Sequence, residues 1–301
     1  MKRYFITLIV AICAVCITSC NDGQNANSKI ITVSIEPLKG LMEEIVGEDF
    51  SVNTLLPVGS SPESYSPTIG QIARLEESEM VFYVGTLPFE NEIIKQSNIE
   101  DSRSINLSRG VELITGHEHH HAHSNEVCDH SHDSHKHGHA HSVDPHIWVS
   151  LDGLSTIVNN IDSALMAAYP DSTKYHINCQ RLNATIAANK ERYQQMLITA
   201  PKDVLIYHPA LGYLAKELSF NQISVEKEGK SPTPASLSEV INKVMAEGIE
   251  VMLYQKEYPL DVVQPIADIL GVKLVEINPL SEDIIGEIDR IMNIISGNYE
   301  Q

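Results

Sequence analysis

Short aliphatic and β-branched runs alternate with amphipathic segments along most of the chain. The first run, residues 29–35 (KIITVSI), is typical of a buried strand, and Pro37 then opens a helix that ends at Gly47. The same alternation predicts strands at 52–56, 80–84 and 104–107, and helices at 68–77 and 88–96. Alternation of strand and helix favours a parallel sheet of the α/β class.

A longer amphipathic segment divides the chain. After a predicted helix at 151–169 and Pro170, residues 172–200 contain neither Gly nor Pro, and their apolar positions fall three, four or seven apart. A helix of about 27 residues is expected here, and it would be about 40 Å long. The alternation then restarts, with strands at 204–207, 222–225, 251–254 and 273–277, and helices at 210–218, 236–248, 260–271 and 282–295.

The pattern therefore predicts an α/β fold of two similar lobes with parallel-type sheets, joined by a long backbone helix. The expected division is an N-terminal lobe at 29–170, a linking helix at 171–200 and a C-terminal lobe at 201–301. Ligands of such sheets bind beyond the carboxyl ends of the strands, so the cleft between the lobes is the expected site.

The N-terminus has the pattern of a bacterial secretion signal. Lys2 and Arg3 precede an apolar run at 4–17 that is short for a membrane span, and Ile17-Thr18-Ser19-Cys20 resembles a lipobox. Residues 1–19 are expected to be a lipoprotein signal peptide, with Cys20 lipidated and the polar stretch 20–28 acting as a tether. We therefore expect an extracytoplasmic protein, anchored in the membrane by lipid and facing the periplasm or the cell exterior.

Composition narrows the possible partners. The 301-residue chain has 21 basic and 40 acidic residues, which give a formal net charge of −19. That charge argues against nucleic acid as a partner and is compatible with a protein that handles cations. The hydrophobic fraction of 43% is that of a globular protein, and a monomer is expected.

A histidine-rich tract at 116–142 carries the clearest chemistry. Imidazole suits zinc and other transition metals, whereas the tract has no hydrophobic period with which to pack. It is expected to be a loop that binds metal loosely and assists a tighter site elsewhere. Its eleven histidines, out of 14 in the chain, are His117, His119, His120, His121, His123, His130, His132, His135, His137, His139 and His141.

A tighter site is predicted where strands of both lobes end. Glu63 lies in the loop after the second strand, His146 follows the histidine-rich tract, and His208 comes directly after the first strand of the second lobe. Two imidazoles and a carboxylate from both lobes can close around a divalent cation. The fourth ligand stays open among water and three side chains near later strand ends: Gln255, Glu257 and Asn278.

Four short stretches resemble the substrate-binding lipoproteins of zinc and manganese ABC transporters. They are PVGSSPESYSP at 57–67, DPHIW at 144–148, HPALGY at 208–213 and INPL at 277–280. Their order, with the lipobox and the histidine-rich insertion, carries the resemblance over nearly all of the chain after the signal. It implies two lobes on a backbone helix, metal in the cleft, a membrane permease as partner, and metal-binding roles for His146 and His208.

The chain departs from the family pattern at two positions. Glu63 stands where the family usually has histidine, and Asn278 stands where manganese-type members often have aspartate. A histidine-rich loop in this place is typical of the zinc branch, so Zn2+ is the expected cargo. Two histidines with a carboxylate are a harder ligand set than three histidines, which keeps Mn2+ as the second choice.

The leading hypothesis is a solute-binding protein that captures Zn2+ for import and is not an enzyme, because no nucleophile–base pair is visible. A metal-storage or adhesion lipoprotein is a second class, in which the histidine-rich tract alone binds metal. A metallohydrolase, with Glu63 as general base beside a two-histidine zinc, is the third and least favoured class.

Overall fold

The computed structural model describes residues 29–115, 143–200, 203–226 and 232–297. The predicted signal peptide, the lipidation site Cys20, the tether and the histidine-rich tract 116–142 lie outside these ranges. Within them, no helix is both long enough and apolar enough to cross a membrane.

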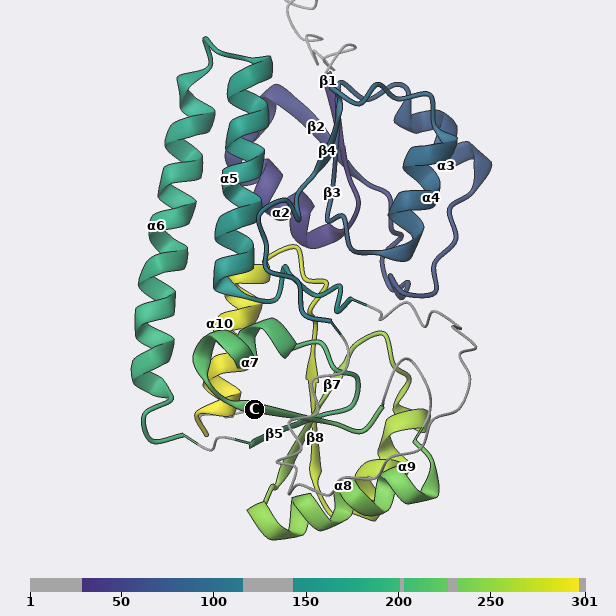
Figure 1. The fold of residues 1–301 in the computed structure, drawn as a ribbon, viewed down its shortest axis with the longest axis vertical. Helices are drawn as coiled ribbons and strands as arrows, with labels where there is room; N and C mark the ends of the chain where they lie inside the picture. The colour runs from purple at the N-terminus through teal and green to yellow at the C-terminus, as the bar shows by residue number, and fades with distance from the viewer. Residues whose placement is uncertain (1–28, 116–142, 201–202, 227–231, 298–301) are drawn as a thin grey trace, which may run out of the picture.

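The first lobe is built on a four-stranded parallel sheet (Figure 1). Its strands are β1 (Lys29–Val33), β2 (Phe50–Thr54), β3 (Met80–Tyr83) and β4 (Ser104–Asn106), in the order β2-β1-β3-β4. Its helices are α2 (Glu36–Val46), α3 (Ile69–Leu75) and α4 (Pro88–Gln96), with a short 3-10 turn η1 (Gly47–Asp49) before β2. Figure 1 shows α2 on one face of the sheet and α3 and α4 on the other.

The second lobe repeats this arrangement. Strands β5 (Asp203–Ile206), β6 (Asn221–Ser224), β7 (Val251–Gln255) and β8 (Lys273–Ile277) are parallel, in the order β6-β5-β7-β8. The helices are α7 (Gly212–Leu218), α8 (Pro234–Glu247), α9 (Leu260–Leu270) and α10 (Ile284–Ile295). In both sheets the first strand lies between the second and the third, so the predicted pair of similar parallel lobes is confirmed.

Helices α5 (Leu151–Ala168) and α6 (Thr173–Met196) form an antiparallel pair beside both lobes (Figure 1). At 24 residues, α6 is about 36 Å long. Near its start, Tyr175 donates a hydrogen bond to Asp49 of the first lobe. Near its end, Arg192 pairs with Asp289 on α10 of the second lobe. The helix stops at Met196, short of the predicted end near residue 199, and Ile198 just beyond it is exposed.

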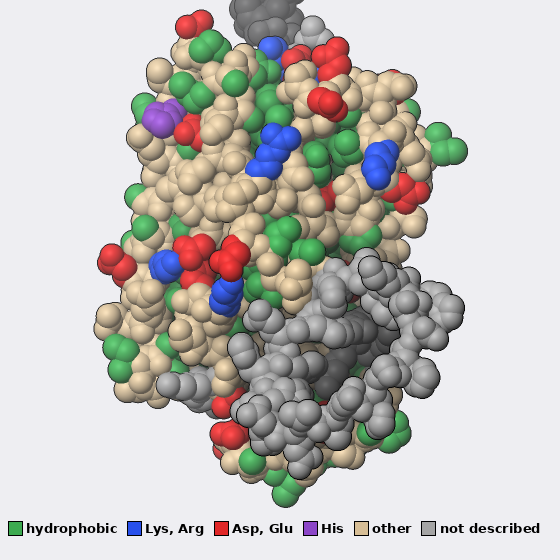
Figure 2. Space-filling model, viewed as in Figure 1, with side chains coloured by type: hydrophobic (Ala, Val, Ile, Leu, Met, Phe, Trp, Pro, Cys, Tyr) green, Lys and Arg blue, Asp and Glu red, His purple; other side chains and the backbone are tan. Residues whose placement is uncertain are grey.

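Charged pairs fasten the second lobe to the α5–α6 pair. Lys190 of α6 lies 2.6 Å from Asp152 Oδ1 of α5 and 3.1 Å from Glu217 Oε1 of α7. Glu217 also accepts a hydrogen bond from the backbone N–H of Leu151. Figure 2 shows acidic and basic side chains gathered on this face, around the junction of α5, α6 and α7.

The hydrophobic core runs from one lobe into the other. One cluster joins the first sheet to α5, α6 and α10 and to one face of the second sheet. A separate cluster fills the opposite face of the second sheet beneath α8 and α9. Since α10 and α6 pack in the shared cluster, the two lobes meet through buried apolar surface, and the edges that face each other carry the loops of the predicted site.

Candidate metal centre

His146 lies in the segment that leads from the first lobe into α5. Its side chain is buried, and its Nδ1 lies 2.8 Å from Asp144 Oδ1, which also accepts the backbone N–H of His146. The neighbouring Trp148 donates its indole N–H to the carbonyl of Pro279 in the second lobe, at 2.9 Å. With Nδ1–H bonded to a carboxylate, Nε2 of His146 is left to face a ligand.

His208 follows β5 at the carboxyl end of the second sheet and is also buried. Its Nδ1 lies 2.9 Å from Glu226 Oε2, an atom that also accepts the hydroxyl of Tyr258 at 3.0 Å. Its Nε2 lies 3.0 Å from Glu63 Oε1. Burial disfavours the imidazolium, but the hydrogen bonds and charges of the two carboxylates outweigh it and raise the pKa of His208 to about 9.

Glu63 is carried by the loop after β2, which α3 and α4 hold in place. Tyr65 packs edge-on against Phe89 of α4, with ring centroids 5.3 Å apart. The Tyr65 hydroxyl donates to Gln71 of α3, whose amide N–H donates to the carbonyl of Leu55. Burial raises the pKa of Glu63, but the hydrogen bond to His208 and the imidazole charges outweigh it, so the net shift is downward and favours the carboxylate.

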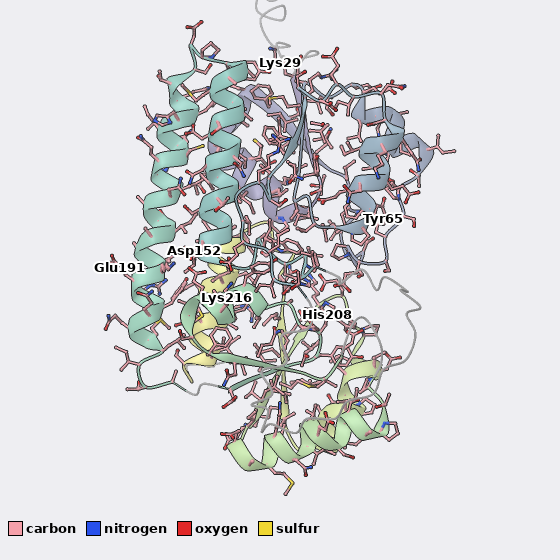
Figure 3. All side chains as sticks on the ribbon, in the orientation of Figure 1. Lys29, Tyr65, Asp152, Glu191, His208 and Lys216 are labelled. Carbon is pink, nitrogen blue, oxygen red and sulfur yellow. The ribbon has the colours of Figure 1, made fainter. Side chains whose placement is uncertain are left out.

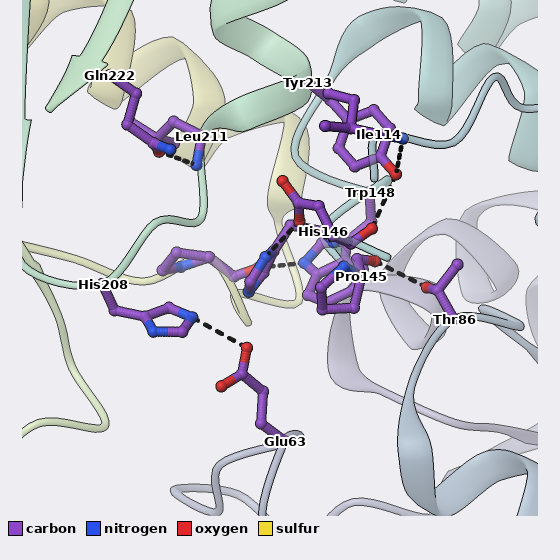
Figure 4. Close-up of polar contacts among 12 residues, drawn as sticks. Glu63, Thr86, Ile114, Pro145, His146, Trp148, His208, Leu211, Tyr213 and Gln222 are labelled. Carbon is purple, nitrogen blue, oxygen red and sulfur yellow. Dashed lines mark hydrogen bonds and ion pairs between the residues drawn. The ribbon is translucent and has the colours of Figure 1, made fainter. Parts of the chain in front are cut away.

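These three side chains converge between the facing edges of the lobes, where Figure 3 places Tyr65 and His208. One ligand atom from each of Glu63, His146 and His208 lies within 4.8 Å of the other two (Figure 4). Among the described residues this is the one group of three histidine, cysteine or acidic side chains so arranged. Ligand atoms of a tetrahedral zinc ion lie about 3.4 Å apart, so a contraction of up to about 1.4 Å from the 4.8 Å limit would close the group on one ion.

The cavity at this site is small, about 30 Å³, and two of the predicted fourth ligands line it. Gln255 donates its amide N–H to the carbonyl of His208, at 2.6 Å. This bond fixes the amide orientation and leaves Gln255 Oε1 buried, with no hydrogen-bond partner among the described residues. Glu257 also lines the cavity, where burial raises its pKa. Asn278 is not among the described residues that line the cavity, and its backbone N–H donates to Glu287.

Two carboxylates that orient the histidines were not anticipated from the sequence. Asp144 stands two residues before His146, so the motif itself offered that signal. Glu226 follows β6, and only the position of β6 beside β5 brings it to His208. In each case a carboxylate holds Nδ1 and leaves Nε2 for a metal, which is the usual support of a metal-binding histidine.

Two parallel α/β lobes on a long helix, with two buried histidines and a half-buried glutamate between the lobes, define a metal-binding protein of the bilobed solute-binding class. The chain matches the model of the ZnuA family, described as zinc-uptake complex component A, periplasmic, over residues 31–300, and it belongs to that family. The description of the family is that of an uptake component, which is a class of binding protein and not of enzyme.

Individual relatives agree with this assignment. The zinc-binding protein AdcA of Streptococcus pyogenes serotype M3 is 27% identical over 264 residues, which cover 84% of this chain and 50% of AdcA, so the chain spans about half the length of that relative. The high-affinity zinc uptake system protein ZnuA of Bacillus subtilis is 23% identical over 296 residues, 93% of this chain and 89% of that protein. A crystal structure of ZnuA superposes with a TM-score of 0.76 at 23% identity, covering 91% of this chain and all of that one, and it confirms the fold.

Proposed function

We propose that this chain is the extracytoplasmic solute-binding protein of a metal ABC transporter, which captures Zn2+ and delivers it to a permease in the membrane. The observation that carries the proposal is the convergence of Glu63, His146 and His208, drawn from both lobes, within 4.8 Å. A site shared by two lobes couples metal binding to their relative position, as capture and release require.

The chemistry of the ligand set supports zinc. Two imidazole nitrogens with one carboxylate oxygen are a common zinc set, and each histidine already has the supporting carboxylate that such sites use. The relatives AdcA and ZnuA are named for zinc binding and zinc uptake. Mn2+ is the competing cargo, because the oxygen donor of Glu63 stands where histidine would favour zinc.

The fourth ligand is assigned to Gln255 Oε1. It is a buried acceptor that lines the cavity and lacks a hydrogen-bond partner among the described residues, and burying such an atom unpaired is costly. Coordination of a cation would satisfy it. Glu257 is the alternative, since its carboxylate also lines the cavity.

We assign 29–170 to the N-terminal lobe, 171–200 to the linking helix and 201–301 to the C-terminal lobe. Cys20 would carry the lipid anchor, the protein would act as a monomer, and the histidines between residues 117 and 141 would gather metal near the cleft or sense it.

A competitive titration with Zn2+ and Mn2+ against a chelator tests the cleft site. The chain is compared with a variant in which a short glycine linker replaces residues 116–142. Thr115 and Val143 are paired as an antiparallel bridge, so a short linker closes the gap without moving either end. His208→Ala and Glu63→Ala are made in this shortened chain, with His176→Ala as the control, because His176 is a surface histidine on α6.

Transport by the cleft predicts one tight zinc site that survives the deletion, is lost in His208→Ala and Glu63→Ala, and is unchanged in His176→Ala. Loss of all tight binding on deletion would instead support storage by the histidine-rich tract. If Mn2+ competes equally with Zn2+, the assignment of zinc as the cargo is wrong. If tight binding survives Glu63→Ala, Glu63 is not a metal ligand.

A further inference from the structure

Tyr213 connects the segments that carry the two histidines of the site. It lies in the first turn of α7, five residues after His208, and is 7% exposed. Its hydroxyl donates to the backbone carbonyl of Asp144 at 2.8 Å and accepts the backbone N–H of Ile114 at 3.1 Å (Figure 4). One hydroxyl from the second lobe thus satisfies two backbone groups that lie on a different segment of the chain.

Those two backbone groups belong to a paired stem. The N–H of Asp144 donates to the carbonyl of Ile114 at 2.9 Å, and Thr115 and Val143 form an antiparallel bridge beside them. The stem therefore holds a fixed geometry of its own, and Tyr213 attaches both of its sides to α7.

Asp144 connects the stem to the candidate metal site. Its side chain accepts both the ring Nδ1 and the backbone N–H of His146. The start of α7 also approaches Asp144 closely, since a Cβ added at Gly212 would come within 2.5 Å of Asp144 Oδ2. The carboxylate that orients His146 is thus held between its own histidine and the backbone of α7.

We propose that Tyr213 is a positioning residue of the metal site, which sets the distance between the His146 and His208 imidazoles by tying their segments together. The two rings lie 5.4 Å apart between centroids, and they approach the metal from segments that meet through this hydroxyl. Removing the hydroxyl leaves the Asp144 carbonyl and the Ile114 N–H without their partner. The inference rests on the proposed function, because it concerns the same cleft.

Tyr213→Phe in the full chain removes only the hydroxyl, and Tyr175→Phe is the matched control. Tyr175 is equally buried, at 3% exposed, and its hydroxyl donates to Asp49 at 2.6 Å on the far part of the first lobe. Both variants should lower the melting temperature to a similar extent. Only Tyr213→Phe should weaken tight zinc binding in chelator competition, by roughly tenfold, the lower end of the range for the loss of a ligand's direct partner, because Tyr213 acts on His146 through Asp144.

A second variant and a metal-free readout make the test independent of one substitution. Gly212→Ala keeps the hydroxyl but pushes a methyl group against Asp144, and it should also weaken zinc binding. In the metal-free protein, the ring proton resonances of His146 should shift in Tyr213→Phe and stay in place in Tyr175→Phe.

Wild-type affinity in Tyr213→Phe, or an equal loss in Tyr175→Phe, would overturn the positioning role. An unchanged His146 resonance in Tyr213→Phe would overturn it as well. Absence of a tight zinc site in the wild-type chain would be the failure of the proposed function itself; the His146 resonances would then still decide whether Tyr213 orders that segment.

Discussion

Replacing Glu226 by Gln tests whether a buried carboxylate prepares His208 for metal. Glu226 is 6% exposed, and one of its oxygens accepts both His208 Nδ1–H and the Tyr258 hydroxyl. Glutamine has the same length and still offers one acceptor oxygen to these donors. It removes the negative charge and places an amide N–H2 where the second carboxylate oxygen was.

The magnitude follows from the bond that is weakened. A hydrogen bond to a charged group contributes about 1.5–3 kcal/mol, whereas a neutral one contributes about 0.5–1.5 kcal/mol. The substitution should therefore weaken the hydrogen bond between residue 226 and His208 Nδ1–H by about 1–2 kcal/mol. A loss of about 1–2 kcal/mol corresponds to a fall in zinc affinity of roughly 5–30-fold.

The assay is chelator competition for zinc, with thermal unfolding of the metal-free protein measured in parallel. Glu217→Gln is the matched control, because Glu217 is a buried carboxylate that pairs with Lys190 and accepts the Leu151 N–H away from the site. The control should lose stability but keep its zinc affinity. Zinc affinity in Glu226→Gln within about twofold of wild type would refute the argument, as would an equal loss in the control.

Three further predictions concern stability and the fourth ligand. Burial raises the pKa of Glu90 to about 7 from an ordinary 4.5, so its contribution to stability is complete below pH 4.5 and is lost as pH rises through 7. Glu90→Gln should remove this pH dependence, which amounts to up to about 3 kcal/mol in the free energy of urea unfolding. An unfolding free energy that still falls between pH 4.5 and pH 7 in Glu90→Gln would contradict this prediction. Gly40→Ala would bring a Cβ within 2.0 Å of the Glu282 carbonyl and should cost about 1–3 kcal/mol in thermal unfolding. In Gly70→Ala on α3 the added Cβ meets nothing within 4 Å, and the variant should be more stable by about 0.5–1 kcal/mol. Equal changes in stability in the two variants would refute the role of the Gly40 contact with Glu282. Gln255→Met should weaken zinc binding by about tenfold or more and remove one oxygen neighbour from the X-ray absorption spectrum of bound zinc; an unchanged spectrum would favour Glu257 or water.

Local pattern was sufficient for the elements of this fold. Alternating apolar runs and amphipathic segments predicted every described strand, because burial in a parallel sheet demands β-branched and aliphatic side chains nearby in sequence. The bounds were less accurate where the end of an element depends on what covers it. Helix α6, for example, ends at Met196, a few residues before its predicted end, and Ile198 beyond it is exposed.

The approach of Glu63 to His208 was also predictable, because each follows a parallel strand and the carboxyl edges of the two sheets face each other. His146 follows no strand, and its Asp-Pro-His-Ile-Trp motif selected it. Sequence order with the resemblance to metal-binding lipoproteins was enough to select them. The three side chains of the candidate metal site were thus selected by the strand pattern, the motif around His146 and residue chemistry.

Apart from Asp144, which the sequence places beside His146, tertiary structure decided which groups support these side chains. Glu226 reaches His208 only because β6 lies beside β5, and Tyr213 meets Ile114 only because α7 packs on the stem 99 residues earlier in the chain. Local sequence periodicity cannot predict such contacts, because a hydrogen bond between distant segments depends on how whole helices and strands pack against each other. The sequence by itself determined which elements form and which side chains can bind a metal, whereas packing between the lobes determined how those side chains are held.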